Sequence, residues 1–386
     1  MRKAVFVFVI LLLLLPAVAG CSGGKKEIPV ATDFGKMLAF VPASILDEHQ
    51  VWFQDPGLAK QQAGFGQVNS YAAWQALSAD QKKAFMAAVG GAMLTGDSSY
   101  LANSDDLYGW DLFMRERTVF CETLPPYQFH ISQGTFDAAL IKQKFTAQDY
   151  KEVSYAGSQY LAWGSDYQID LGNPFHAHVM AGFNRVMVTN TTIITAPTTA
   201  IMQGILDARA GNVQSIGGEP AGRALADQLG EVYGAFIATQ SNLTSYFNMM
   251  NPVLQFHIDA AKSWQPLHDY ALAGIGYRKN GPDRYLDICV AYASAADAEA
   301  DAPLLDARLK SYVFLTDQPN VDSSQWLPLT DTFDLSAPVV TKYDGAATVT
   351  FHLRYLPATG GVNLLTIGSF GDLLFLAPDP APYLAP

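Results

Sequence analysis

Short apolar runs typical of strands alternate along the chain with longer stretches in which apolar residues recur at helical spacing. Phe85 and Val89 lie at that spacing and predict a helix over residues 78–92. Asn280-Gly281 separates two apolar runs and predicts the turn of a β-hairpin. Strands and helices are therefore expected to be mixed throughout the chain.

A strand, a turn and a helix follow one another in two separate stretches, residues 129–145 and residues 286–309. The two stretches resemble degenerate copies of one unit, close to a split β-α-β motif. Between them, residues 184–195 predict two adjacent strands joined by a tight turn, which favours antiparallel pairing. The sequence therefore predicts an α+β fold of two related lobes, each of mainly antiparallel sheet with helices packed on one face.

A chain of 386 residues is long enough for two lobes that each bury a core. We place the N-terminal lobe over residues 34–245 and the C-terminal lobe over residues 246–386. The boundary is expected within residues 240–252.

The first twenty residues have the pattern of a secretory signal peptide. Arg2 and Lys3 provide the positive end, and residues 5–15 form an unbroken apolar run. That run is shorter than the roughly 20 residues needed to cross a bilayer. Residues 1–20 are therefore expected to be removed, which places the mature chain on the extracytoplasmic side of a membrane.

Val18-Ala19-Gly20-Cys21 follows the apolar run and resembles the lipobox of bacterial lipoproteins. The resemblance implies cleavage before Cys21, a diacylglycerol thioether on its sulfur and acylation of its new amine. Two or three acyl chains make a lasting membrane anchor. Residues 21–33 then form a flexible tether with the lipidated cysteine at its start. An ordinary secretory signal with a chance cysteine, or an uncleaved short anchor, is the alternative.

Composition excludes two classes of protein. A charged fraction of 16% together with 12% aromatic residues excludes wholesale disorder. A formal charge of −12 argues against nucleic-acid binding, which needs a basic surface. Without Arg2 and Lys3 the chain has 22 basic residues against 36 acidic ones, so an anionic membrane surface would repel it. Attachment to the membrane is therefore expected to depend on the lipid.

His176 and His178 are the clustered histidines of the chain. On a strand, both imidazoles would point to one side, as a metal site requires. The sequence places no Cys, Asp or Glu directly beside them, although Asp166 or Asp170 can fold back. Since Asn173 and Pro174 precede the pair, a loop is the alternative. We assign no metal or cofactor and keep the two histidines as weak candidates.

Two further stretches pair an imidazole with a carboxylate, His257-Ile258-Asp259 and His268-Asp269. Such a pair can orient a general base. The chain has no Gly-X-Ser-X-Gly sequence that would supply a nucleophile. We therefore assign no catalytic residue and expect the protein not to be an enzyme.

Cys121 and Cys289 both lie in apolar runs and are candidates for a disulfide outside the cytoplasm. A bridge between them would close a loop of 168 residues. On a chain-entropy model it would stabilise the fold by about 5 kcal/mol. The alternative is two packed, unpaired thiols.

Residues 217–222 have the sequence Gly-Gly-Glu-Pro-Ala-Gly and superficially resemble a phosphate-binding loop. A phosphate loop uses backbone N–H groups and is followed by Lys and Ser or Thr. Here Glu219 brings negative charge and Pro220 suits a first helical position, so we interpret the stretch as a helix start.

Several motifs together resemble a family of uncharacterised bacterial envelope proteins, often lipoproteins, that open with a Leu-Pro-Ala motif. The matching pieces are Val41-Pro42-Ala43, Gly134-Thr135-Phe136-Asp137, Tyr155-Ala156-Gly157 and the predicted helix at residues 198–209. Val41 stands where the family has leucine. The resemblance implies the fold and brings no catalytic residues with it.

These observations predict a lipid-anchored protein of the bacterial cell envelope. We expect it to be a non-enzymatic scaffold, adaptor or binding protein. Its expected partners are the membrane, through the lipid, and another envelope protein, while its small-molecule ligand is unknown. One alternative is the solute-binding lipoprotein of a transporter, which would need two parallel-sheet lobes. A second alternative is an extracytoplasmic hydrolase that uses His176 and His178, or His257 and Asp259.

Overall fold

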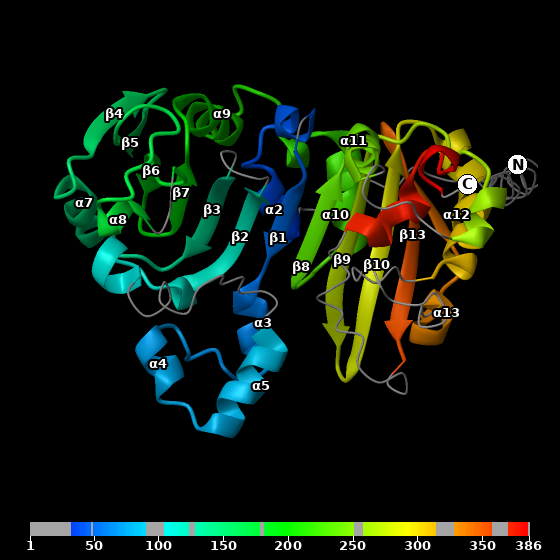
Figure 1. Ribbon diagram of the computed structural model, residues 1–386, viewed down its shortest axis with the longest axis horizontal. Coiled ribbons are helices and arrows are strands. Elements are labelled where there is room, and N and C mark those ends of the chain that lie inside the picture. Colours follow the sequence, from blue (N-terminus) through cyan, green and yellow to red (C-terminus); the bar gives the residue numbers. More distant parts are fainter. Residues whose placement is uncertain are drawn as a thin grey trace, which may run out of the picture.

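The computed structural model describes residues 32–47, 49–89, 104–122, 128–177, 181–250, 258–313, 328–356 and 370–384. Within them, thirteen strands form one sheet in which every pairing is antiparallel (Figure 1). The order along the sheet is β11-β13-β10-β9-β8-β1-β2-β3-β7-β6-β5-β4, and β12 pairs with β13. The α+β class and the antiparallel sheet are confirmed.

The strands are β1 Val51–Gln54, β2 Arg115–Glu122, β3 Gln128–Gly134, β4 Lys151–Tyr155, β5 Ser158–Ala162, β6 Arg185–Val188, β7 Thr192–Ala196, β8 Gly234–Ala238, β9 Leu272–Asn280, β10 Asp283–Tyr292, β11 Phe333–Leu335, β12 Val339–Tyr343 and β13 Ala346–Tyr355.

The α-helices are α2 Asp33–Leu38, α3 Pro56–Gln62, α4 Tyr71–Gln75, α5 Ala79–Val89, α7 Ala138–Thr146, α8 Pro174–Ala177, α9 Thr199–Ala210, α10 Pro220–Leu229, α11 Gln240–Met250, α12 Ala295–Ser311 and α13 Leu329–Thr332. The 3₁₀ helices are η1 Ala43–Asp47, η3 Leu112–Met114, η4 Ile216–Gly218, η5 Asp259–Ser263, η9 Phe370–Leu376 and η10 Ala381–Tyr383.

Helices cover both faces of the sheet, so the expectation of helices on one face is wrong. On β10, Ile288 faces the core that contains Leu305 of α12, whereas Cys289 faces the core that contains Leu225 of α10. The contacts agree, because α10 and α12 each touch β10 and β13. Residues 286–292 are buried without interruption, as in strands that are covered on both sides.

The two expected lobes are the two halves of one continuous sheet. Strand β8 lies between β1 and β9 and is hydrogen-bonded to both. The expected boundary between residues 245 and 246 falls inside α11. The C-terminal half therefore extends the sheet of the N-terminal half at β8.

Local sequence explains where most helices begin. Asp55 caps α3, and Thr198 caps α9, which ends at Gly211 with a φ of 76°. Helix α7 is capped by the carboxylate of Asp137. The Asp137 side chain accepts hydrogen bonds from two backbone N–H groups of the first turn.

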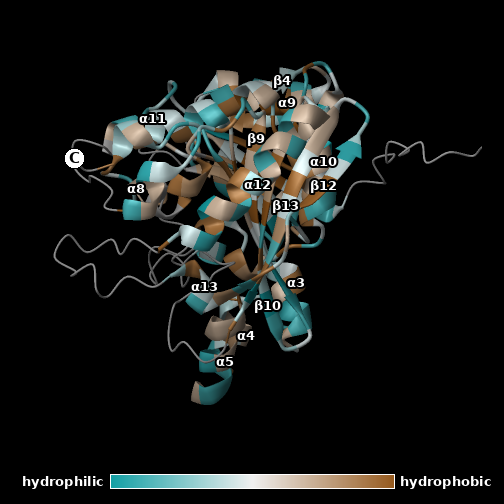
Figure 2. Cartoon of the chain, turned by 90° about the vertical axis from the view of Figure 1, so that its right-hand side faces the viewer, coloured by the Kyte–Doolittle hydropathy of each residue, from teal (hydrophilic) through white to brown (hydrophobic). Residues whose placement is uncertain are grey.

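Helices α3, α4 and α5 lie together below the ends of β1, β2 and β3 in Figure 1, and α4 and α5 are at the bottom of Figure 2. They share a small core, which includes Val68, Phe85 and Phe113. Figure 2 shows that apolar residues are otherwise concentrated on the strands between the covering helices. The junction between this small core and the sheet contains the cavity described next.

Candidate functional site

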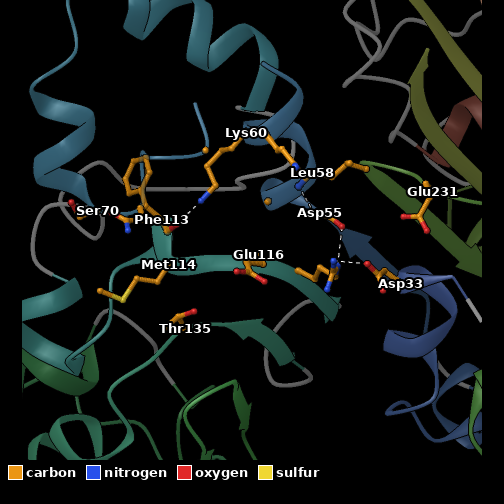
Figure 3. Close-up of a pocket in the computed structure, with 15 residues that line it drawn as sticks. Asp33, Asp55, Leu58, Lys60, Ser70, Phe113, Met114, Glu116, Thr135 and Glu231 are labelled. Atoms are coloured by element: carbon orange, nitrogen blue, oxygen red, sulfur yellow. Dashed lines mark hydrogen bonds and ion pairs between the residues drawn. The ribbon is translucent and has the colours of Figure 1, made fainter. Parts of the chain in front are cut away.

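A cavity of about 670 Å³ lies where the starts of α2 and α3 meet β2 (Figure 3). Its other walls come from the loop before α4, from η3 and from the turn before β8. Pockets for small ligands have volumes of roughly 300–1,000 Å³. The cavity is therefore large enough for a small molecule.

Arg117 of β2 joins the two helix starts. Its guanidinium lies 2.5 Å from an oxygen of Asp33 and 3.1 Å from an oxygen of Asp55. Lys36 also pairs with Asp33, at 2.8 Å, and this hydrogen bond is the main cause that lowers the Asp33 pKa. Burial raises the pKa of Asp55, although Arg117 and the Leu58 N–H oppose that effect. The Arg117 charge is thus used within the protein wall.

Lys60 lies on α3 with only 5% of its surface exposed. Its ammonium donates to the backbone carbonyls of Phe113, at 2.7 Å, and Val68, at 3.3 Å. Burial lowers the Lys60 pKa. These hydrogen bonds tie α3 to η3 and to the loop before α4, so Lys60 also serves the wall.

Close backbone packing brings α3 against β2. The Asp55 carboxylate accepts from the Leu58 N–H at 2.6 Å, and Pro56 occupies the first position of the helix. A Cβ on Gly57 would lie 3.1 Å from the Glu116 backbone. The absence of a side chain at Gly57 thus allows the approach that brings Glu116 to the cavity.

Two carboxylates of the cavity wall, Glu116 and Glu231, are exposed. Within the described part of the chain, neither lies within 4 Å of a basic side chain. Figure 3 shows them on either side of Asp55. Acidic residues of the cavity wall outnumber basic ones, with four carboxylates against Lys60 and Arg117.

The histidine candidates lie far along the chain from this cavity. His176 is in the short helix α8, not on a strand, and is 1% exposed. Its ring stacks on Trp163 with the ring centres 3.7 Å apart, and burial lowers its pKa. His178 lies outside the described residues. Among the described residues, no three His, Cys, Asp or Glu side chains are placed to hold a metal ion.

The proposed disulfide between Cys121 and Cys289 is corrected by the structure, since both are buried, free cysteines. Cys121 is on β2 and Cys289 is on β10, and three strands lie between them in the sheet. Neighbouring strands are about 4.8 Å apart, whereas a disulfide needs Cα atoms within about 7 Å of each other. Burial also raises the pKa of Cys289, to about 12.

His268 does not pair with Asp269. Its Nδ1 lies 2.6 Å from Oδ1 of Asp301 on α12, and its backbone N–H donates to Oδ2 of the same side chain at 2.8 Å. Tyr292 also donates to Asp301, at 3.0 Å. The imidazole is 51% exposed, whereas the Asp301 side chain is fully buried. His257 and Cys21 lie outside the described residues.

This pair predicts a pH dependence of stability. The hydrogen bond and charge of Asp301 raise the His268 pKa above its ordinary value of about 6.5. The contribution of the protonated His268 to stability is therefore complete below a pH of about 6.5, its ordinary pKa, and is lost as pH rises through the folded-state pKa. We expect the urea midpoint to fall more between pH 6 and pH 8 in the wild type than in His268→Gln. Equal pH dependence in the two proteins would show that the imidazole does not titrate against Asp301.

Sequence reasoning missed the cavity. In the sequence, Asp55 before Pro56 indicates only a helix cap, and Arg117 and Lys60 belong to no motif. Asp55 and Arg117 are 62 positions apart, so their pairing follows from the sheet and not from local sequence.

No helix within the described ranges is long and apolar enough to cross a membrane.

No family model and no curated protein matches the chain. Solved structures to which it is similar include crystal forms of TP0453. Form I is 8% identical with a TM-score of 0.29, and the match covers 80% of this chain and 92% of TP0453. Forms III and IV are both 7% identical to this chain, with a TM-score of 0.33. Both matches cover 80% of this chain, and they cover 93% of form III and 92% of form IV. A likeness at this level carries no argument about function, so the cavity is interpreted from its own residues.

Proposed function

We propose that this chain is a lipid-anchored, non-enzymatic binding protein of the bacterial envelope that holds a small polar ligand in the cavity beside Arg117. The cavity carries the proposal, because its volume suits a small molecule and its lining combines a buried aromatic residue with exposed polar residues. Phe113 is the buried aromatic residue of the lining, and Asn69 and Thr135 are exposed polar residues of it.

Binding is favoured over catalysis by how the charged groups are used. Arg117 is held by two carboxylates, and the Lys60 ammonium by two backbone carbonyls. Groups fixed in this way give a cavity a defined shape, whereas a general acid or base must exchange its proton with substrate. The transporter alternative requires parallel-sheet lobes, whereas all the described strand pairs are antiparallel.

The test of ligand binding is native mass spectrometry of the full-length protein purified gently in detergent. We expect an additional mass that is released on denaturation. In Phe113→Trp, the larger side chain would reduce the volume of the cavity, so the additional mass should be lost while the protein still folds. A bare protein mass from wild type, under conditions that preserve other complexes, would contradict the proposal.

The anchor is predicted from Val18-Ala19-Gly20-Cys21 and is tested separately. Wild-type protein should fractionate with membranes after a salt wash and incorporate labelled palmitate, because acyl chains anchor it. Cys21→Ala should move to the soluble fraction and lose the label. Cys121→Ala, which removes a buried cysteine of the folded body, should behave as wild type. Retention of Cys21→Ala in the washed membranes would contradict lipid anchoring.

A further inference from the structure

We infer that α8 and the loop directly before it, residues 169–177, form an acid-sensitive cover that opens when His176 takes up a proton. The cover lies on an aromatic core of the N-terminal half that includes Tyr108, Phe145 and Phe183. None of its residues lines the cavity beside Arg117, so its opening does not depend on the proposed function.

Only two residues of the cover are buried. Phe175 and His176 have 3% and 1% of their surface exposed, whereas every other residue from 169 to 177 is at least partly exposed. The most exposed apolar residue among them is Leu171, at 69%. Segments with few buried apolar contacts open at a lower free-energy cost than the rest of a fold. The attachment of the cover therefore depends strongly on its two buried rings and on the hydrogen bond that Tyr108 donates to the Phe175 carbonyl.

The turn before the cover, residues 164–168, is held more firmly. The Asp166 carboxylate accepts from the Arg185 guanidinium at 2.6 Å. The side-chain amide of Asn184 donates to the Gln168 carbonyl at 3.0 Å. The cover can therefore swing away from the aromatic core while this turn stays in place.

The His176 imidazole is buried without a hydrogen-bond partner. Within the described part of the chain, neither its Nδ1 nor its Nε2 has one. The ring stacks on Trp163 at 3.7 Å and is nearly parallel to Tyr150, with the ring centres 5.8 Å apart. The Trp163 ring can attract a cation, but it supplies neither of the hydrogen bonds that an imidazolium makes to water. The closed cover therefore favours the neutral imidazole.

The charged and titratable groups around His176 do not reverse this preference. The Asp170 charge favours the protonated imidazole, but burial has the larger effect and lowers the His176 pKa. Tyr150 is neutral, because burial raises its pKa. Arg185 and Asp166 form an ion pair with each other. A proton on His176 would therefore be poorly accommodated in the closed cover.

Acid therefore favours the open cover. Once open, the imidazole is in water and has its ordinary pKa of about 6.5, whereas burial in the closed cover lowers it. The open cover thus binds a proton that the closed cover does not, and opening becomes easier as pH falls below about 6.5. The His268 pKa is raised instead, so that histidine has the opposite effect. A readout confined to the cover separates the two.

The test is hydrogen exchange measured by mass spectrometry on the full-length protein in a neutral detergent, at pH 7.5 and pH 5.5. The N–H groups of His176 and Ala177 both donate to the Asn173 carbonyl and report the opening of α8. After correction for the intrinsic effect of pH, their exchange should rise roughly threefold to tenfold at pH 5.5, since one proton changes an equilibrium at most about tenfold per pH unit. Residues 164–168 should change little. No rise in the cover, or an equal rise throughout the chain, would overturn the inference.

Variants assign the effect to the imidazole. His176→Phe keeps an aromatic ring on Trp163 but cannot take up a proton, so the rise should disappear. Asp170→Asn keeps an acceptor for the Gly172 N–H, and its rise should exceed that of wild type, because the closed cover then disfavours the proton more strongly. His352→Phe removes a histidine of β13 and should behave as wild type. A wild-type rise in His176→Phe would overturn the inference, and a smaller rise in Asp170→Asn would contradict the charge balance on which it depends.

Discussion

Gly222→Ala should lower the free energy of unfolding by about 3 kcal/mol, because the new methyl group has no space. Gly222 lies in the first turn of α10, and a Cβ there would lie 1.9 Å from the carbonyl oxygen of Ile216. The Ile216 backbone cannot easily retreat. Its N–H donates to Val41, and the next residue, Gly217, already packs against the backbone of α2. The urea midpoint measured by tryptophan fluorescence gives the change in stability.

Gly204→Ala is the matched control, since Gly204 also lies within a helix, α9. A Cβ at this position would meet only Pro42, at an ordinary 3.6 Å. The helix should therefore gain roughly 0.5–1 kcal/mol from the lost flexibility of the unfolded chain. The two substitutions are chemically identical and are expected to have opposite signs. Equal midpoints for Gly222→Ala and wild type would show that η4 moves freely away from α10.

Helix ends and turns show what local sequence could predict. The start of α10 at Pro220 and the end of α9 at Gly211 follow from rules that involve only neighbouring residues. The hairpin at Asn280 and Gly281 follows in the same way, with Gly281 at a φ of 58° in the turn. A glycine is needed at position 222 because η4, which packs against α2, lies so close to α10. The need for it therefore depends on packing between elements and not on neighbouring residues.

The sequence predicted an antiparallel sheet in an α+β fold, but not that one sheet continues through both halves of the chain. A strand covered on one face should alternate apolar and polar residues, whereas residues 286–292 of β10 are buried throughout. That run was a signal for helices on both faces. The pairing of β8 with β9 has no such local signal, because it joins segments on either side of the expected boundary between the lobes. The separation of Cys121 from Cys289 follows from that pairing.

The cavity depends even more on distant contacts. Asp55 and Arg117 meet because β1 pairs with β2, and Lys60 reaches Phe113 across 53 positions. Each residue alone is an ordinary charged residue near a helix or strand end. A single sequence shows the charges and the helix caps but not which charges will neutralise one another.

A buried arginine ties the C-terminal segment to α12. Arg308 is 1% exposed, and its Nη1 donates to the carbonyls of Phe375, at 3.0 Å, and Ala377, at 2.6 Å. Its Nη2 donates to Gln265 and, at 3.4 Å, to Pro378. Burial lowers the Arg308 pKa to about 10, which still leaves the guanidinium protonated at neutral pH. One side chain thus satisfies carbonyl groups from two separate segments.

Arg308→Met should therefore destabilise the protein by about 3–5 kcal/mol, since it fills similar space but leaves those carbonyls without a donor. Hydrogen exchange should increase first in residues 370–384. Phe375, whose carbonyl accepts from Nη1, belongs to η9, and Ala377, whose carbonyl also accepts from Nη1, directly follows it. Arg354→Met is the control, because Arg354 pairs with Asp334 at the surface and exposed pairs contribute at most about 1 kcal/mol. Arg308→Lys should lie between the two, since an ammonium cannot reach the same set of carbonyls. If Arg308→Met were no less stable than Arg354→Met, water would have to replace the guanidinium, and the C-terminal segment would be held by its apolar contacts alone.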